Sequence, residues 1–197
     1  NEMFSLNQLP KQAVIVGGGY IAVEFAGILN GLGVQTDLIY RGDRLLKTFD
    51  PQCSDKVTEG MIAKGVNIHV KTEVSSISGK ENNLTVHLNN GQSIEAGIAL
   101  YATGRTANTK SLGLENTAIK TQANGAIVVN DYFQTAEPTI YALGDVIDRV
   151  QLTPVAIQES MLLLELLYGD SQPKMDYANI PTAVFSQPEL ATVGLTE

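Results

Sequence analysis

The feature that most constrains this chain is a run of glycines, Gly17 to Gly19, placed between an apolar stretch at residues 13–16 and a segment of helical periodicity at residues 20–30. A short strand that ends in glycines and leads directly into a helix is the first half of a βαβ unit. In such a unit Gly17 permits a tight turn, Gly19 has no Cβ to block a pyrophosphate, and Ala22 lets the helix pack close to the strand. The phosphates would lie on the unpaired N–H groups at the helix N-terminus. The sequence therefore predicts a dinucleotide-binding turn.

The βαβ pattern continues beyond this turn. A second strand is predicted at residues 34–40, Asp50-Pro51 is typical of an N-cap followed by proline at the first helical position, and a third strand follows at residues 66–70. This order predicts an α/β fold with a Rossmann-like parallel sheet. The first helix is expected to bury one face, which carries Ile21, Phe25, Ile28 and Leu29.

The pattern changes from parallel to antiparallel after residue 70. Residues 73–78 and 84–88 alternate in polarity, Asn90-Gly91 is a strong hairpin signal, and residues 94–103 continue as β structure. An antiparallel β-meander is therefore expected in place of the next crossover helix.

The last part of the chain has a weaker pattern. The polar segment at residues 106–110 indicates a domain boundary, and short strands are predicted at residues 127–129 and 140–143. Thr153 is a good N-cap for a helix that reaches Gly169. Residues 181–197 begin another β segment. We therefore expect domains at residues 1–105, 106–152 and 153–197.

Composition excludes several classes of protein. The formal net charge is −8, without the basic excess of a nucleic-acid-binding module. A membrane-spanning helix needs a run of about eighteen apolar residues, and the sequence contains none. Residues 1–10 lack the features of a signal peptide. The single cysteine, Cys53, excludes an internal disulfide framework and a multi-thiolate zinc site, and it reads as an ordinary helix residue. A cytoplasmic protein without a metal site is expected.

Two patterns in the sequence predict different dinucleotides. Asp37 lies about twenty residues beyond the first glycine, where NAD enzymes place the acidic residue that binds the ribose. However, the strand continues to Tyr40, which is followed by Arg41, Arg44 and Lys47. A 2′-phosphate carries a charge of about −1.5 to −2 and needs such cations. A solvated basic turn is the ordinary alternative, but beside a dinucleotide-binding turn the cations favour NADPH.

The segment GGGYIAVEFAGILNGLG at residues 17–33 resembles the NADPH-binding motif of the two-domain flavoprotein disulfide reductases, the family that includes glutathione reductase. The resemblance continues, in the order of the family, through residues 102–105, 139–146, 152–156 and 180–185. It implies that residues 1–105 form the NADPH-binding domain and residues 106–152 the C-terminal part of the FAD domain. Residues 153–197 would then be a helix and the start of the dimer-interface domain.

The resemblance also implies roles for individual residues. Arg41 and Lys47 match the cations that hold the 2′-phosphate, although relatives often have arginine at the second position. Tyr20 matches the ring that covers the nicotinamide pocket, and Glu24, one helical turn further, matches a glutamate that pairs with a lysine of the flavin domain. Both could equally be ordinary residues of a solvated helix face. The set expected at NADPH is Gly17, Gly19, Tyr20, Ile21, Ala22, Glu24, Arg41, Lys47, Gly104 and Arg105.

A second set of residues matches the FAD site of the family. Asp145 corresponds to the carboxylate that binds the ribityl chain. Leu152 and Thr153 correspond to the helix start beneath the flavin ring, where the helix dipole favours a reduced, anionic flavin. Gly144-Asp145 could also be a simple strand-end turn.

The resemblance implies a homodimeric enzyme that passes electrons from NADPH through FAD and a cysteine pair to glutathione disulfide. The family's cysteine pair and its catalytic histidine have no match here, and His69 and His87 lie in predicted strands. The chain is therefore interpreted as a central portion that cannot complete catalysis alone. Relatives that reduce other disulfides share these loops, and a stand-alone NADP-binding sensing or scaffold module is the alternative.

Overall fold

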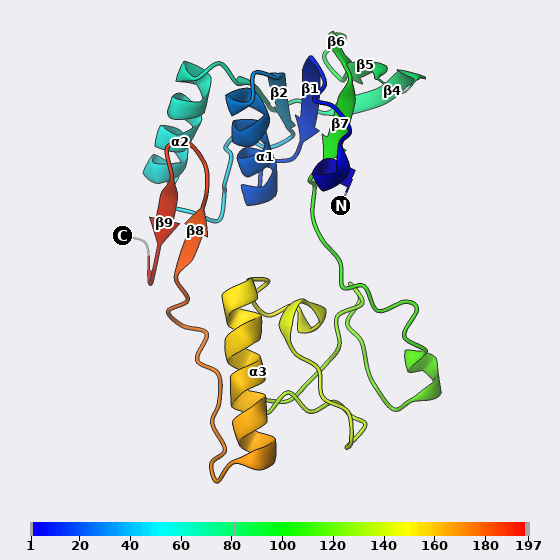
Figure 1. Ribbon diagram of the computed structural model, residues 1–197, viewed down its shortest axis with the longest axis vertical. Helices are drawn as coiled ribbons and strands as arrows, with labels where there is room; N and C mark the ends of the chain where they lie inside the picture. The colour runs from blue at the N-terminus through cyan, green and yellow to red at the C-terminus, as the bar shows by residue number, and fades with distance from the viewer. Residues whose placement is uncertain (1, 81, 196–197) are drawn as a thin grey trace. The chain divides into compact units, whose positions relative to one another are not determined.

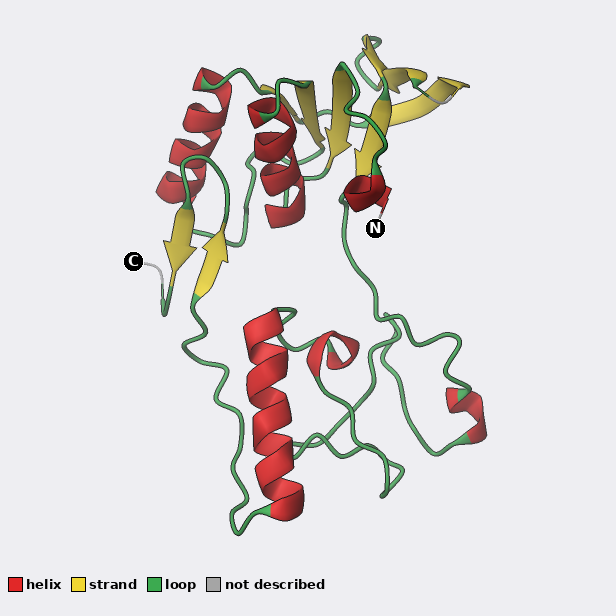
Figure 2. Cartoon of the chain, viewed as in Figure 1, coloured by secondary structure: helices red, strands yellow, loops and turns green. Residues whose placement is uncertain are grey.

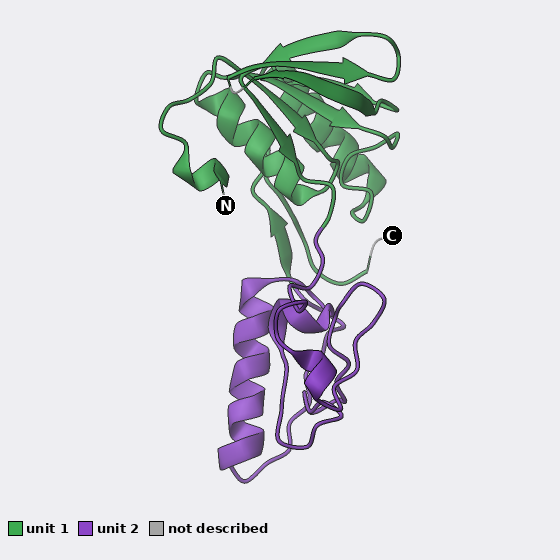
Figure 3. Cartoon of the chain, turned by 90° about the vertical axis from the view of Figure 1, so that its right-hand side faces the viewer, with its two compact units in different colours: residues 1–104, 181–197 green, residues 105–180 purple. Residues whose placement is uncertain are grey.

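The computed structural model describes residues 2–80 and 82–195. The chain forms two compact units: one consists of residues up to 104 together with those from 181 onward, and the other of residues 105–180 (Figure 3). Helices and strands are both present (Figure 2), and all of the strands β1–β9 belong to the first unit. The expected α/β class is confirmed.

A parallel sheet of order β3-β2-β1-β7 forms the centre of the first unit (Figure 1). The helices α1 and α2 connect consecutive strands, and both lie on the same face of the sheet. The residue bounds are β1 Gln12–Val16, α1 Tyr20–Gly31, β2 Gln35–Tyr40, α2 Pro51–Ala63, β3 Asn67–Val70 and β7 Ile98–Tyr101, with a short 3-10 helix η1 at Glu2–Ser5.

The start of α2 agrees with its sequence signal. The Asp50 carboxylate accepts hydrogen bonds from the backbone N–H groups of Gln52 at 2.8 Å and Cys53 at 3.0 Å, and Pro51 opens the helix. An N-cap of this kind satisfies two donors that a helix leaves unpaired.

The buried face of α1 differs from the predicted one. Ile28, expected inside, is 53% exposed. Small side chains let the helix approach the sheet closely, so the contact surface turns toward the alanines. The buried residues of α1 are Ala22, Val23, Ala26 and Leu29.

The opposite face of the sheet is covered by the predicted β-meander, which consists of β4 Val74–Lys80, β5 Asn83–Leu88 and β6 Ser93–Ala96. Its strands pair antiparallel in the order β4-β5-β6. Val86 and Leu88 pack there against Val14 and Ile39 of the parallel sheet. The sheet is thus enclosed by helices on one face and by the meander on the other.

A short antiparallel hairpin completes the first unit. It is formed by β8 Thr182–Val184 and β9 Leu190–Thr192. Val184 and Leu190 are buried in the same core cluster as Val57 and Met61 of α2. The hairpin therefore packs on the helical layer, and the predicted β segment after residue 181 is confirmed.

The second unit is built around the long helix α3 Thr153–Tyr168, with two short 3-10 helices, η2 Leu114–Asn116 and η3 Gly144–Ile147. The strands predicted at residues 127–129 and 140–143 are wrong. Each segment contributes only one isolated bridge, Thr121 with Ile127 and Gln134 with Tyr141. An extended apolar segment becomes a strand only when a neighbouring backbone pairs with several of its residues.

The start of α3 also differs from the prediction. Leu152, not Thr153, is the N-cap, and no side chain caps this end. The first intrahelical bond runs from the Ala156 N–H to the Leu152 carbonyl at 3.1 Å. Within the part of the chain that the structure describes, no acceptor is provided for the N–H groups of Thr153 and Val155, so the positive end of the helix is open.

Candidate functional site

The first glycine of the turn is fixed by the sheet. Gly17 has a φ of +148°, which favours glycine, and its N–H donates to the Ile39 carbonyl at 2.9 Å. A Cβ at this position would overlap the carbonyl oxygen of Ala102, directly after β7, and would lie 3.2 Å from the Cβ of Ala22. The turn thus needs both a glycine at 17 and a small residue at 22.

The other two glycines serve different purposes. A Cβ on Gly18 would lie 2.6 Å from ring atoms of Tyr40, whose side chain packs flat against the turn. A Cβ on Gly19 would meet nothing within 4 Å. The absence of a side chain at Gly19 therefore keeps open space in front of the helix, where a ligand could lie.

The N-terminus of α1 presents unpaired donors to this open space. The first bond of the helix runs from the Val23 N–H to the Gly19 carbonyl at 3.1 Å, and the N-cap, a glycine, has no side chain. Among residues 2–80 and 82–195, no oxygen accepts from the N–H groups of Tyr20, Ile21 or Ala22. Such a helix end attracts an anion.

Three cations follow β2, and the structure separates them. Arg44 donates to the Asp55 carboxylate at 3.0 Å and is therefore engaged within the protein. Arg41 and Lys47 are exposed, and neither forms a hydrogen bond or ion pair with any described residue. Two of the three predicted cations are thus free to bind an external anion.

Asp37, the competing candidate for the ribose, lies inside the protein. It is only 4% exposed, and its Oδ1 is 2.9 Å from Nε2 of His69 on β3. Its Oδ2 is buried and has no partner among the described residues. The Asp37 carboxylate therefore couples β2 to β3, and it does not reach the end of the sheet where a ribose would lie.

Tyr20 and Glu24 occupy the first turns of α1. Tyr20 is 37% exposed. The Glu24 Oε1 accepts a hydrogen bond from the Phe185 N–H at 2.9 Å. The contact with Phe185 joins residues 161 positions apart, and no local pattern in the sequence indicates it.

The predicted residues around the flavin site are partly brought together. Arg105 Nη2 lies 3.1 Å from Asp145 Oδ2, so two residues assigned to different nucleotides form an ion pair. Both side chains are about half exposed, at 53% and 46%. Gly104 has a φ of +147°, and a Cβ on it would meet nothing within 4 Å. Leu152 and Thr153 form the uncapped start of α3.

A polar network, which the sequence did not indicate, lies behind the Asp145 turn. The Glu159 side chain is only 1% exposed, and its Oε2 accepts from the Gly144 N–H at 2.6 Å. Its Oε1 accepts from the Tyr177 hydroxyl at 2.7 Å. Burial, and next the hydrogen bond to Glu159, raises the pKa of Tyr177, so the phenol keeps its proton and donates. Its sequence neighbours Gln158 and Ser160 are both polar, so no local pattern marked Glu159 as the buried carboxylate of this helix.

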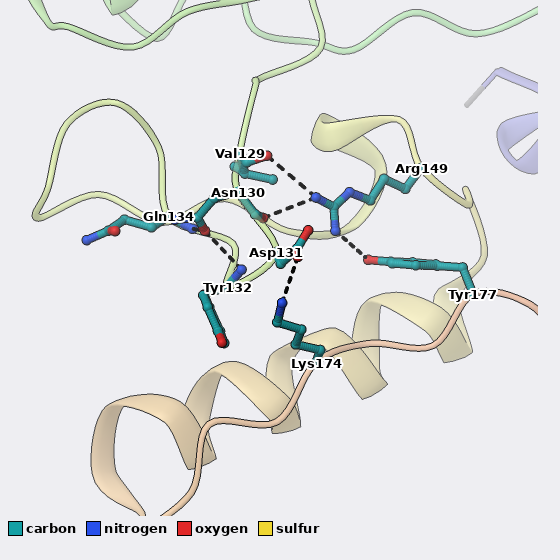
Figure 4. A network of polar contacts seen from close by, with 8 residues as sticks. All are labelled: Val129, Asn130, Asp131, Tyr132, Gln134, Arg149, Lys174 and Tyr177. Atoms are coloured by element: carbon teal, nitrogen blue, oxygen red, sulfur yellow. Dashed lines mark hydrogen bonds and ion pairs between the residues drawn. The ribbon is translucent and has the colours of Figure 1, made fainter.

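Arg149 connects this network to the surrounding loops (Figure 4). Its guanidinium donates to the Tyr177 hydroxyl at 3.3 Å and to the Asn130 carbonyl at 3.1 Å. Nearby, Lys174 pairs with Asp131 at 2.9 Å. The segment before the hairpin is therefore tied to the loop that precedes the Asp145 turn.

Other types of site receive no support from the described residues. They contain no group of three or more His, Cys, Asp or Glu side chains placed to hold a metal ion. Of the helices in the described ranges, none is both long and apolar enough to cross a membrane.

Comparison with known proteins identifies close relatives. The chain is 42% identical over 209 residues to the glutathione reductase of Nostoc sp. and 39% identical over 197 residues to that of Burkholderia cepacia. Each match covers the whole chain but only 46% and 44% of the relative. The chain thus spans less than half the length of these relatives.

The structural comparison agrees. The HOCl-induced flavoprotein disulfide reductase RclA from Escherichia coli superimposes with a TM-score of 0.93 and 32% identity, over 99% of this chain and 45% of that one. Residues 1–160 match the family model of the pyridine nucleotide-disulphide oxidoreductases. The chain therefore belongs to the pyridine nucleotide-disulphide oxidoreductase family.

Proposed function

We propose that this chain is the NADPH-binding portion of a flavoprotein disulfide reductase that acts on glutathione disulfide. The observation that carries the proposal is the free N-terminus of α1 beside two cations without partners, Arg41 and Lys47. The unpaired N–H groups suit the pyrophosphate, and the open space at Gly19 admits it. The cations suit a further phosphate on the ribose.

The environment of Asp37 supports NADPH over NADH. An NAD site needs an acidic acceptor for the 2′-hydroxyl at the end of the second strand, but Asp37 is buried and engaged with His69. The residue at the end of β2 is Tyr40, which packs against Gly18. Without an acidic acceptor there, the free Arg41 and Lys47 decide the preference.

Roles for Tyr20 and Glu24 at the nicotinamide end form part of the proposal. Tyr20 is the first residue of α1, and its side chain is 37% exposed. From this position its ring can cover the bound nicotinamide. Glu24 contacts the Phe185 N–H through one oxygen only, so its Oε2 remains available for the lysine that the family's flavin domain presents. Ile21 and Ala22 contribute backbone donors, and Gly104 and Arg105 border the cofactor.

A flavin would be held by the second unit together with protein outside this chain. Asp145 would accept from a ribityl hydroxyl, since only its Oδ2 is engaged by Arg105. The uncapped start of α3 at Leu152 and Thr153 would face the ring with its positive dipole end. When bound, NADPH supplies a hydride and FAD accepts it and passes electrons to a disulfide.

The organisation of the larger protein follows from the same proposal. Residues 1–105 would be the NADPH-binding domain, residues 106–152 part of the FAD domain, and residues 153–197 a helix and the start of the dimer-interface domain. A cytoplasmic homodimer with glutathione disulfide as its substrate is consistent with the glutathione reductases that the chain resembles.

A titration of the chain with NADPH and NADH tests the proposal. We expect tighter binding of NADPH, and we expect Arg41→Ala to weaken it by about tenfold to hundredfold, the range for a lost charge-assisted hydrogen bond. Binding of NADH should change less than about threefold, because it has no 2′-phosphate.

Arg44→Ala is the matched control. It removes the same charge from the same turn, but Arg44 is engaged by Asp55, so the NADPH preference should remain. Equal affinity of the wild-type chain for both nucleotides would contradict the 2′-phosphate site. An Arg44→Ala effect as large as that of Arg41→Ala would reduce the site to general electrostatic attraction.

A further inference from the structure

The Asp145 turn is held from the inside by a residue that cannot touch a flavin itself. Glu159 lies on α3, one turn beyond its first residues, and is 1% exposed. Its Oε2 accepts a hydrogen bond from the Gly144 N–H at 2.6 Å. Gly144 is the residue directly before Asp145. We propose that Glu159 is a positioning residue for the flavin-binding turn, an inference that rests on the proposed role of Asp145.

The geometry of the turn makes this hydrogen bond important. Gly144 has a φ of +70°, and a Cβ on it would lie 3.2 Å from the Cβ of Ala156, so the turn passes close to α3. Gly144 is buried, and none of the described residues offers its N–H another acceptor. A buried donor that loses its acceptor moves until it finds another one or water. Such a movement would carry Asp145 with it.

A buried carboxylate needs compensation, and Glu159 receives it from two donors. Besides the Gly144 N–H, the Tyr177 hydroxyl donates to Oε1 at 2.7 Å. Arg149 donates to the Tyr177 oxygen at 3.3 Å, and its guanidinium carbon lies 5.4 Å from the centre of the Tyr177 ring. Both carboxylate oxygens are thus engaged, and a positive charge stands behind one donor. This arrangement holds Glu159 in one orientation.

Asp145 is also held from the outside. Arg105 pairs with its Oδ2 at 3.1 Å, where both side chains are about half exposed. An exposed ion pair orients a side chain weakly, whereas the buried bond to Glu159 restrains the backbone of the turn. The division of roles follows from burial: Glu159 sets where the turn lies, and Arg105 only biases the rotamer of Asp145.

The test uses three substitutions in the full-length flavoprotein that contains this chain, with the equilibrium constant for FAD as the main measurement. Glu159→Leu has no acceptor for the Gly144 N–H, and it should weaken FAD binding by about tenfold to hundredfold, as for loss of a charge-assisted hydrogen bond. Glu159→Gln can accept from Gly144 with its oxygen and donate to Tyr177 with its amide, so it should restore FAD binding to within about threefold of wild type. Tyr177→Phe leaves the bond to Gly144 in place and should have an effect smaller than that of Glu159→Leu.

Three further measurements separate positioning from general damage. The affinity for NADPH should change little in any variant, since the residues proposed to hold its phosphates, at the start of α1 and at Arg41 and Lys47, lie in the other unit. The visible absorption spectrum of the bound flavin should shift only in Glu159→Leu. Glu165→Leu removes an exposed carboxylate from the same helix and should leave FAD binding unchanged. If Glu159→Leu holds no flavin, hydrogen exchange of the Gly144 amide in that variant should be faster, with α3 still protected; loss of protection throughout α3 would overturn the inference.

The outcomes are distinguishable. A wild-type flavoprotein that holds no FAD overturns the proposed function and this inference together. A wild type that binds FAD while Glu159→Leu binds it equally tightly overturns the inference alone. An equal loss in Glu159→Gln and Glu159→Leu would also overturn it, because the amide preserves the hydrogen bond that the inference requires.

Discussion

Gly60, in the last turn of α2, offers a test of how the β8–β9 hairpin is held. A Cβ on Gly60 would overlap the Cδ of Pro188 and lie 3.2 Å from its Cγ. Gly27, in the middle of α1, has nothing within 4 Å of the same position. The same substitution, glycine to alanine, is therefore crowded at one site and open at the other.

The magnitudes decide the expected sign. Alanine is better than glycine inside a helix by about 0.8–1 kcal/mol, so Gly27→Ala should stabilise the first unit by about that amount. Gly60→Ala receives the same gain, but overpacking costs about 1–3 kcal/mol. We expect a net destabilisation of about 1 kcal/mol. The largest possible destabilisation is the free energy of releasing the hairpin. Release would expose Val184 and Leu190, at a cost of about 1.5–3 kcal/mol each.

The assay is native-state hydrogen exchange of the whole chain, because its two units need not unfold together. In Gly60→Ala the amides of β8 and β9 should lose protection before those of β1 and β2. In Gly27→Ala protection should rise in the first unit, and the hairpin should be unaffected. The reasoning is refuted if Gly60→Ala stabilises as much as Gly27→Ala while the hairpin stays protected.

Two other substitutions follow from the electrostatics. Partial desolvation, and after it the nearby Asp50 carboxylate, raises the pKa of the Cys53 thiol. Cys53 should therefore react slowly with iodoacetamide near pH 7.5. Asp50→Asn should accelerate this reaction, whereas the control Asp55→Asn should not. His69→Leu leaves the buried Asp37 carboxylate without its partner and should lower the free energy of unfolding in urea by about 2 kcal/mol, somewhat less than for a fully buried pair because His69 is partly exposed. The double variant with Asp37→Leu should recover most of this loss, and no recovery would show that the pair itself stabilises the sheet.

Much of the first unit could be predicted because its signals are local. The turn at Gly17, the N-cap at Asp50 and the hairpin signal at Asn90-Gly91 each depend on a few neighbouring residues, and each is confirmed. The buried face of α1 was predicted less well, because hydrophobicity alone favours Ile28 over Ala26. How closely a helix approaches its sheet depends on side-chain size on both surfaces, which periodicity does not report.

The second unit was less predictable because its contacts join distant residues. The apolar segments at residues 127–129 and 140–143 have the composition of strands, but the described chain offers each of them only one bridge. The bond between Glu159 and Gly144 and the pair of Arg105 with Asp145 likewise join residues 15 and 40 positions apart. A single sequence contains no spacing rule for such contacts.

The three glycines of the opening turn show how the structure sharpens a motif. The sequence explains Gly17 and Gly19 by the needs of a nucleotide, but it has no reason for Gly18. In the structure that reason is Tyr40, whose ring would also lie 2.5 Å from a Cβ on Gly42. The ring therefore packs against both the glycine turn and the turn that follows β2, so the two elements proposed to bind phosphates contact one aromatic side chain. Any side chain larger than hydrogen at position 18 or 42 would have to displace this ring, so Tyr40 accounts for two glycines that the nucleotide motif alone leaves unexplained.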